Sequence, residues 1–454
     1  MLARLRSFLT PGSTLKGRTL KGGVVALGGF GAAQALRLIS NLIMTRLLAP
    51  DAFGLMALTL AIEIFIGMVS DLGLDASIVR SKKGDDPAFL ATARTMQLIR
   101  ALFIAGCMIA IALALAPLTA AGFFPASSVY ADPRLPWFMA LMALSVAITG
   151  LSAMRIALHN RTLNLVPVIR LELGAQILAI AATIAGAAGG LGAYALALGG
   201  VISASGKVIG SYLFLSGPPA RFGFDRAHFN EIFNYGKWLV LASTLGFLAA
   251  RGDQLLFGWL FEGPTFGLYA IGMIWIATGR NLIEQVQRRV AYPALAELHR
   301  ERAHDLTRVY RRMRFVYEVG CFVLFLAVVA LADIAVGALY PDAYRDVAHY
   351  MRLLSVSLLL VPYRLLSSVL LTGGDSRRYT IVAIMPGVAL FGATPFIFLR
   401  FGADAAIVFA ALTPLLAIPF NWKFAAKFIK IDFLREIAML VVAIGAGALL
   451  LYFA

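Results

Sequence analysis

The first long apolar segment of the chain carries a stripe of polar side chains. Gln34, Arg37, Asn41 and Thr45 are spaced three or four residues apart, which places them on one face of a helix. A guanidinium inside an apolar segment is costly and is usually retained for a purpose, and it can bind a phosphate through paired hydrogen bonds. The stripe therefore predicts either a cavity wall that binds an anion, or a network between helices in which Arg37 pairs with an acid.

A similar segment occurs about half the chain further on. The motif Phe-Gly-Leu at 53–55 returns at 266–268, and each copy follows an apolar segment that holds an arginine. In the second copy Thr244, Arg251 and Gln254 share a helical face, and Arg251 lies one residue from the position equivalent to Arg37. The repeat predicts two related lobes, each with an arginine facing other helices or a wet cavity.

Two acidic residues also lie inside apolar segments. Asp253 follows Arg251 by two residues, so the two side chains point to different sides and are not expected to neutralise each other. Asp253 must therefore find another partner, protonate or face water. Glu63 lies deep in the second apolar segment and could pair with the first helix. Both acids are candidates for ion coupling, with a structural salt bridge as the alternative.

The composition describes an integral membrane protein. Hydrophobic residues make up 60% of the chain and charged residues only 14%, which is far from a soluble globular domain. A spanning helix needs about 20 mostly apolar residues, and the chain offers roughly thirteen such runs. The net charge of +16 falls in the links between these runs, so we expect no nucleic-acid partner. No nucleotide loop and no metal-spaced Cys/His cluster is present, so neither a cofactor nor a metal is expected.

The runs predict an all-α fold of two bundles. A short segment at 1–21 precedes six runs within 22–215, a polar link occupies 216–235, six further runs fill 236–424, and a last run covers 434–454. Of the 40 Lys and Arg residues, 33 fall in alternate links, which places those links and the N-terminus in the cytoplasm by the positive-inside rule. The largest of these links is predicted to form an amphipathic helix on the membrane surface.

Three stretches resemble a known family. TRLLAPDAFGLMAL (45–58), DLGLDASIVR (71–80) and RGDQLLFGWLFEGPTFGLYAIG (251–272) resemble the polysaccharide transporters, the Wzx-like lipid-linked oligosaccharide flippases of the multidrug/oligosaccharidyl-lipid/polysaccharide (MOP) exporter superfamily. The resemblance covers nearly the whole chain. It implies two six-helix bundles related by a pseudo-twofold axis normal to the membrane. The single extra helix expected at 434–454 departs from the twelve- and fourteen-helix members.

The resemblance also implies a function and a site. Members transfer an undecaprenyl-diphosphate-linked repeat unit from the cytoplasmic to the periplasmic leaflet of the bacterial inner membrane, for exopolysaccharide, O-antigen of lipopolysaccharide, or capsule. A polysaccharide polymerase and a chain-length regulator are the protein partners that this implies. The expected cavity residues, with the diphosphate on the arginines and the sugars on the amides and hydroxyls, are Arg37, Arg251, Gln34, Asn41, Thr244 and Gln254. Arg46 could serve release or anchor at the interface.

Two other classes fit the sequence less well. A cation-coupled multidrug exporter of the same fold would be expected to have acidic, aromatic-lined cavities, and the arginines at 37 and 251 argue against it. A membrane polysaccharide polymerase would need a sizeable periplasmic loop and leaves the internal repeat unexplained. We therefore expect a transporter and not an enzyme, with two lobes that rock to give alternating access. Without an ATP site, an ion gradient, the membrane potential or removal of product would drive transport.

Overall fold

The computed structural model describes residues 15–453 except 163, 220, 302 and 373–375. The regular secondary structure of the described chain is helical apart from one isolated bridge between Ser128 and Glu262. Eight of its helical stretches are long and apolar enough to cross a membrane. The all-α membrane fold expected from the sequence is confirmed. The expected N-terminal segment at 1–21 lies mostly outside the described residues, and helix α2 already begins at Leu15.

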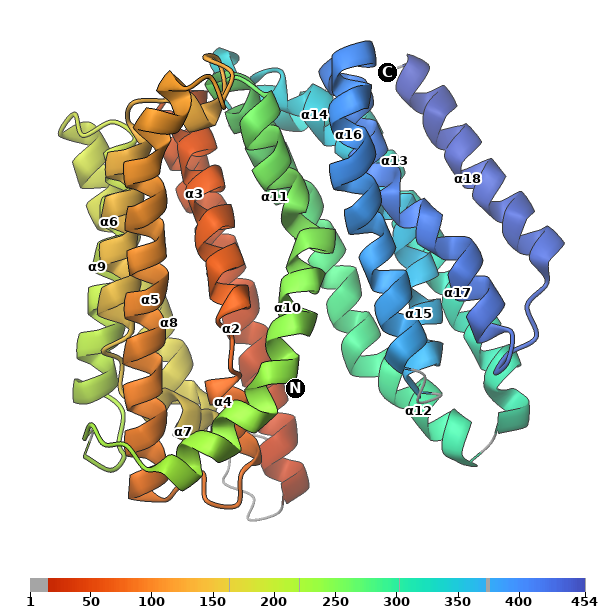
Figure 1. Cartoon of the computed structure of the whole chain (residues 1–454). Coiled ribbons are helices and arrows are strands. Elements are labelled where there is room, and N and C mark those ends of the chain that lie inside the picture. Colours follow the sequence, from red (N-terminus) through yellow and green to blue (C-terminus); the bar gives the residue numbers. More distant parts are fainter. Residues whose placement is uncertain (1–14, 163, 220, 302, 373–375, 454) are drawn as a thin grey trace, which may run out of the picture. The chain divides into compact units, whose positions relative to one another are not determined.

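The chain divides into two compact units. Unit 1 comprises residues 1–48, 62–126 and 130–244, and unit 2 comprises 49–61, 127–129 and 245–454. Helices α5, α6, α8 and α9 of unit 1 pack side by side (Figure 1). The helices contributing to unit 1 are α2 (Leu15–Met44), α3 (Pro50–Val69), α4 (Leu74–Arg80), α5 (Pro87–Ala120), α6 (Leu135–Thr149), α7 (Arg155–Arg161), α8 (Leu165–Ala188), α9 (Tyr194–Leu213) and α10 (Arg226–Leu260). Helices α3 and α10 contribute residues to both units.

Two helices of unit 1 are interrupted where the sequence predicted continuous runs. Helix α3 ends at Val69, and the chain turns before α4 begins. Gly73 adopts φ 61° at this turn, a left-handed conformation that favours glycine, and its amide donates to Asp71 Oδ1 at 3.0 Å. Helix α6 ends at Thr149, and α7 begins six residues later, at Arg155. Hydropathy alone does not detect the second break, because residues 150–154 (GLSAM) contain no charged side chain.

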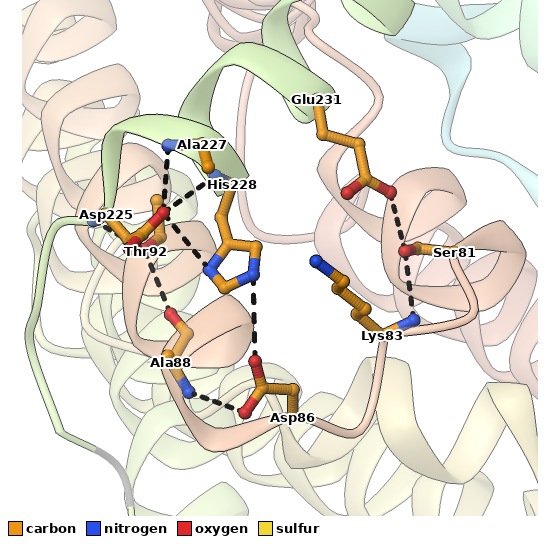
Figure 2. A network of polar contacts seen from close by, with 9 residues as sticks. All are labelled: Ser81, Lys83, Asp86, Ala88, Thr92, Asp225, Ala227, His228 and Glu231. Carbon is orange, nitrogen blue, oxygen red and sulfur yellow. Dashed lines mark hydrogen bonds and ion pairs between the residues drawn. The ribbon is translucent and has the colours of Figure 1, made fainter.

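Helix α10 begins inside the polar link, at Arg226, and a hydrogen-bonded network fixes its start (Figure 2). Asp225 Oδ1 accepts from the amides of Ala227 at 2.8 Å and His228 at 3.0 Å, so it caps the helix. The His228 ring packs edge-on against Phe89, and its Nε2 lies 3.7 Å from Asp86 Oδ2 at the start of α5. The link is thus ordered by contacts to α5 that its own composition does not reveal.

Unit 2 contains the remaining helices. They are α11 (Gly263–Val286), α12 (Tyr292–Glu301), α13 (Leu306–Leu339), α14 (Val347–Ser355), α15 (Arg364–Thr372), α16 (Ser376–Leu412), α17 (Ile418–Ala425) and α18 (Phe433–Phe453), and short 3₁₀ or π turns join several of them. Helix α16 bends at Gly402, which has φ 87°. Helix α18 is tied to α13 by an ion pair between Glu436 and the buried Arg314.

The link expected on the membrane surface forms the amphipathic helix α12, but its apolar face is covered by protein. Leu295 of α12 is fully buried and belongs to a core that includes Leu306, Leu366 and Ile418 from α13, α15 and α17. Burial of one leucine contributes roughly 1.5–3 kcal/mol relative to exposure. The apolar face is therefore used for packing inside unit 2 and is not available to lipid.

The two copies of the repeated Phe-Gly-Leu motif meet inside unit 2. A Cβ on Gly54 would lie 2.9 Å from the carbonyl oxygen of Gly263, and one on Gly267 would lie 1.8 Å from that of Pro50. The first turns of α3 and α11 therefore cross in backbone contact, which only glycine permits at these positions. The repeated motif thus marks the point at which α3 and α11 cross.

Candidate functional site

A cavity of about 520 Å³ lies within unit 1, between the two interrupted helices and α5. Its walls come from both sides of each interruption, and its polar lining residues are Glu63, Asp71, Asp75, Gln97, Arg100, Ser145, Thr149 and Ser152. Small-molecule sites usually measure roughly 300–1,000 Å³. Irregular backbone at membrane depth is tolerated where it is buried in protein or lines a wet cavity, and this cavity provides such a place.

Helix α5 holds both interruptions open with two polar side chains one turn apart. Gln97 Nε2 lies within hydrogen-bonding distance of the carbonyl oxygens of Thr149 at 3.4 Å, Gly150 at 3.2 Å and Ser152 at 3.4 Å. These carbonyls follow the last turn of α6, where helices leave their acceptors unsatisfied. Gln97 therefore acts as a cap for a helix that is remote from it in sequence.

Arg100 does the same for α3. Its Nη2 donates to the carbonyl of Gly67 at 2.8 Å, and its Nε lies 3.4 Å from Ser70 Oγ. The same guanidinium lies 3.7 Å from Asp71 Oδ1. A cation at a helix C-terminus is favoured by the helix dipole as well as by the hydrogen bonds. The Arg100 guanidinium thus binds groups of the protein that surround the cavity.

The cavity lining holds more acidic than basic side chains. Three carboxylates and one guanidinium line it. Glu63 Oε2 is buried and has no hydrogen-bond partner. Asp75 as a residue is exposed, but desolvation of its carboxylate is the largest influence and raises its pKa; the charge of Arg100 lowers it and that of Asp71 raises it further. The site therefore disfavours anions and favours neutral or cationic ligands.

The residues predicted on α2 lie outside this cavity lining. Arg37 and Arg46 are exposed on α2 and just beyond its end, and Gln34 and Asn41 are half-buried. Thr45 is buried and its hydroxyl donates to the carbonyl of Leu42 at 3.0 Å. Among the described residues Arg37 forms no ion pair. Of the two readings of the stripe, a network that neutralises Arg37 with an acid does not occur in the described part of the chain.

The predicted residues of α10 divide between exposed and buried positions. Arg251 is exposed and Gln254 half-buried, while the hydroxyl of Thr244 donates to the carbonyl of Val240 at 2.7 Å. Asp253 is 9% exposed and accepts a hydrogen bond from the buried Tyr269 hydroxyl of α11. Of the alternatives open for Asp253, the structure shows a partner on another helix.

Only Glu63, among the predicted site residues, opens into the unit 1 cavity. Gln97 and Arg100 also line this cavity and are not among the residues predicted from the sequence. Their signal is nevertheless present: two polar side chains three residues apart begin the apolar run at 95–118. Such a pair resembles the polar stripe on α2 and could have been selected by the same criterion. Arg37 and Arg251 belong to units 1 and 2, respectively.

Comparison with known proteins identifies the family. Residues 43–349 match the model of a family described as polysaccharide biosynthesis protein. The match covers more than half of the chain and includes α3 to α13, and hence the whole unit 1 cavity. The chain belongs to this family. No curated protein sequence matches the chain.

Solved structures show that this polysaccharide biosynthesis protein has a MOP-type transporter fold. The lipid II flippase MurJ in an inward closed conformation matches with a TM-score of 0.65 and 11% identity, over 96% of this chain and 97% of that one. An inward-facing multidrug resistance MATE family transporter gives 0.63 and 14%, over 87% and 94%. A MOP superfamily transporter from Pyrococcus furiosus gives 0.52 and 13%, over 91% and 95%. The protein is a multi-pass membrane protein with the fold of flippases and exporters.

Proposed function

We propose that this protein is a flippase for lipid-linked oligosaccharides. It moves repeat units carried on undecaprenyl diphosphate from the cytoplasmic to the periplasmic leaflet of a bacterial inner membrane, for exopolysaccharide, O-antigen or capsule assembly. The proposal is supported by membership of a polysaccharide biosynthesis family and by a fold like that of a lipid II flippase. A polymerase and a chain-length regulator would take up the product on the periplasmic side.

The observation that carries the proposal is the exposed Arg37, on a helix that the sequence predicts to span the membrane. An arginine inside a span normally pairs or faces a wet pathway, and Arg37 has no ion pair among the described residues. The repeat places a second exposed arginine, Arg251, on α10. A diphosphate needs compensating cations in a medium of low dielectric, and guanidinium binds phosphate through paired hydrogen bonds. We assign both arginines to the diphosphate, with Gln34, Asn41, Thr244 and Gln254 as polar groups along its path and Arg46 at release.

An ion gradient, the membrane potential or removal of the product could drive transport, and an ion gradient requires titratable or ion-binding groups. Asp253 and Glu63 are the coupling candidates, because both are carboxylates within segments that the sequence predicts to span the membrane. Asp253 is bonded to Tyr269, whereas Glu63 faces a cavity with one oxygen unpaired. Alternating access would then come from rocking of two lobes around the substrate path.

The test replaces the arginines in the producing cell. We expect Arg37→Ala and Arg251→Ala to abolish most surface polymer and to hold repeat units in the cytoplasmic leaflet. Arg251→Lys should have an intermediate effect, because a lysine ammonium cannot form the paired hydrogen bonds of a guanidinium. Arg226→Ala, at the exposed start of α10, is the matched control and should behave as wild type. Surface polymer and the lipid-linked repeat units of each leaflet are measured at equal protein levels.

Two results would contradict the proposal. Normal polymer in both alanine variants would remove the arginines from the pathway. An unchanged leaflet distribution after deletion of the whole protein would remove the flippase function itself.

A second function is favoured by one observation. The negative cavity of unit 1 suits cationic compounds, as a multidrug exporter would require, and the comparison structures include such a transporter. Efflux of a cationic dye from cells that produce the protein, dependent on Glu63 and independent of polymer synthesis, would support this reading over the flippase.

A further inference from the structure

We propose that the unit 1 cavity binds the sugar part of the transported molecule through its hydroxyl groups, while the diphosphate is held elsewhere. This inference rests on the proposed function. It adds that the sugar and the diphosphate bind at different places in the protein. The predicted site had assigned sugars to amides and hydroxyls of α2 and α10, none of which lines this cavity.

The size of the cavity points to an organic ligand. A volume of about 520 Å³ lies within the usual range of small-molecule sites and suits roughly one or two sugar rings. A bare cation, held by oxygens at about 2.0–2.6 Å, would leave most of this volume to water. A coupling ion alone therefore does not account for the space.

The charge of the cavity excludes the diphosphate. Glu63, Asp71 and Asp75 outnumber the single cation, and Arg100 is already bonded to Gly67 and Ser70. Bringing a polyanion close to these carboxylates would be strongly unfavourable in a medium of low dielectric. A neutral or amino sugar meets no such penalty. The chemistry thus separates the two ends of the substrate.

The lining offers the acceptors that sugar hydroxyls need. Each hydroxyl can donate one hydrogen bond, and carboxylates accept several. Glu63 Oε2 is buried with no partner, a state that is costly until a donor satisfies it. Gln97 uses its amide nitrogen on the α6 carbonyls, which leaves its Oε1 as an acceptor. Ser145 and Thr149 contribute hydroxyl groups to the part of the lining formed by α6.

The backbone around the cavity supports the same conclusion. Secondary transporters commonly place substrate sites where spanning helices are interrupted. Here α3 and α6 are both interrupted at the cavity, and both interruptions are capped from α5. Gln97 and Arg100 are therefore positioning residues that keep the walls apart when the cavity is empty of sugar.

The experiment measures protection of a cysteine at the cavity wall. Thr149→Cys is introduced into a Cys107→Ala background, purified, and labelled with a water-soluble maleimide. The probe is the free repeat-unit oligosaccharide, released by depolymerising the host's own surface polymer, without lipid or phosphate. We expect the oligosaccharide to slow labelling at least about threefold at near-saturating concentration. Thr162→Cys, exposed at the end of α7 and outside the lining, is the matched control and should label at an unchanged rate.

Substitutions at Glu63 separate sugar binding from ion coupling. Glu63→Gln retains a hydrogen-bonding oxygen and should keep the protection, whereas Glu63→Leu removes it and should weaken the sugar's apparent affinity about tenfold. If Glu63 binds only a proton or a cation, both variants would lose that binding, because neither side chain carries a carboxylate. Equal protection in both variants would overturn the sugar assignment.

Three other results would also overturn it. These are protection by sodium chloride but not by sugar, stronger protection by inorganic pyrophosphate than by sugar, and no protection by any probe.

The leaflet measurement distinguishes failure of the cavity proposal from failure of the flippase proposal. A protein that still moves repeat units in cells but shows no protection refutes the cavity assignment alone, whereas an unaffected leaflet distribution after deletion refutes the flippase function.

Discussion

Asp75 is the cavity residue whose titration couples to stability. Desolvation raises the pKa of its carboxyl in the folded protein, with Arg100 opposing and Asp71 adding to the shift. A raised pKa means that the folded state binds the proton more tightly than the unfolded state. Ionisation of Asp75 therefore costs stability, and the cost is absent below the ordinary pKa of aspartate, about 3.9, and complete above the raised value.

We expect Asp75→Asn to stabilise the protein at neutral pH, because the amide carries no charge to desolvate. The gain should shrink as the pH falls through the raised pKa and vanish near pH 4, about the ordinary pKa of aspartate. Thermal unfolding of the purified protein across this range measures the effect. Asp85→Asn, an exposed residue beside Arg161, is the control. A gain that is independent of pH, or a loss at neutral pH, would contradict the electrostatic explanation.

At the scale of elements, the interruption after α3 depends on one glycine. Gly73 has φ 61°, and a left-handed residue with a side chain costs about 1–2 kcal/mol. We expect Gly73→Ala to destabilise the protein by about this amount and Gly73→Asn by less, since asparagine tolerates the conformation. Gly67→Ala is the matched control, because a Cβ there meets nothing within 4 Å and alanine favours a helix by about 1 kcal/mol.

The comparison of these variants also tests the cavity wall. If Gly73→Ala and Gly67→Ala shift the midpoint of thermal unfolding in the same direction, the turn is not held in the left-handed conformation. Surface polymer should fall in Gly73→Ala, since Asp71 and Asp75 flank this turn and both line the cavity.

The start of α10 depends on a single capping carboxylate, that of Asp225. The amide of His228 donates to Asp225 and lowers the carboxyl's pKa; desolvation opposes this, and the amide of Ala227 and the charges of His228 and Lys83 lower the pKa further. The cap therefore stabilises α10 above the ordinary pKa of aspartate, and its contribution is lost as the pH falls through the lowered value.

We expect Asp225→Ala to increase hydrogen exchange of the amides at 226–232 at neutral pH, because two amides lose their acceptor. Asp225→Asn keeps an oxygen in place and should exchange more slowly than the alanine variant. Acidification of the wild type below the lowered pKa should reproduce the alanine pattern. Equal exchange in wild type and Asp225→Ala would show that the contacts of Figure 2 made by His228 and Thr92 suffice without the cap.

At the scale of the whole molecule, the crossing of α3 and α11 gives the internal repeat a structural meaning. Backbone contact at Gly54 and Gly267 leaves no room for side chains, and the closer approach is at Gly267. We expect Gly267→Ala to destabilise the protein by about 1–3 kcal/mol or more, and Gly54→Ala by less. Gly320→Ala, where a Cβ meets nothing within 4 Å, is the control. Thermal unfolding and surface polymer are measured together, and a neutral Gly267→Ala would rule out the close crossing.

The class of the protein could be predicted from its residues without the structure. The free energy of placing a residue in a membrane depends first on the residue itself. The apolar content, the length of the apolar runs, and the arginines at 37 and 251 can therefore be read directly from the sequence. The repeated Phe-Gly-Leu motif and the isolated acids Glu63 and Asp253 were equally visible. These features were enough to predict an all-helical membrane transporter.

The position of the cavity and the contacts between distant residues become visible only in the folded protein. The breaks after Val69 and Thr149 are stabilised by Arg100 and Gln97, whose donors reach carbonyls far away in sequence. In the same way Asp253 is satisfied by Tyr269 of the next helix, and the apolar face of α12 is covered by core residues of α13, α15 and α17. Hydropathy measures transfer of one segment from water, whereas these outcomes depend on hydrogen bonds and packing between segments, which exist only once the helices have assembled.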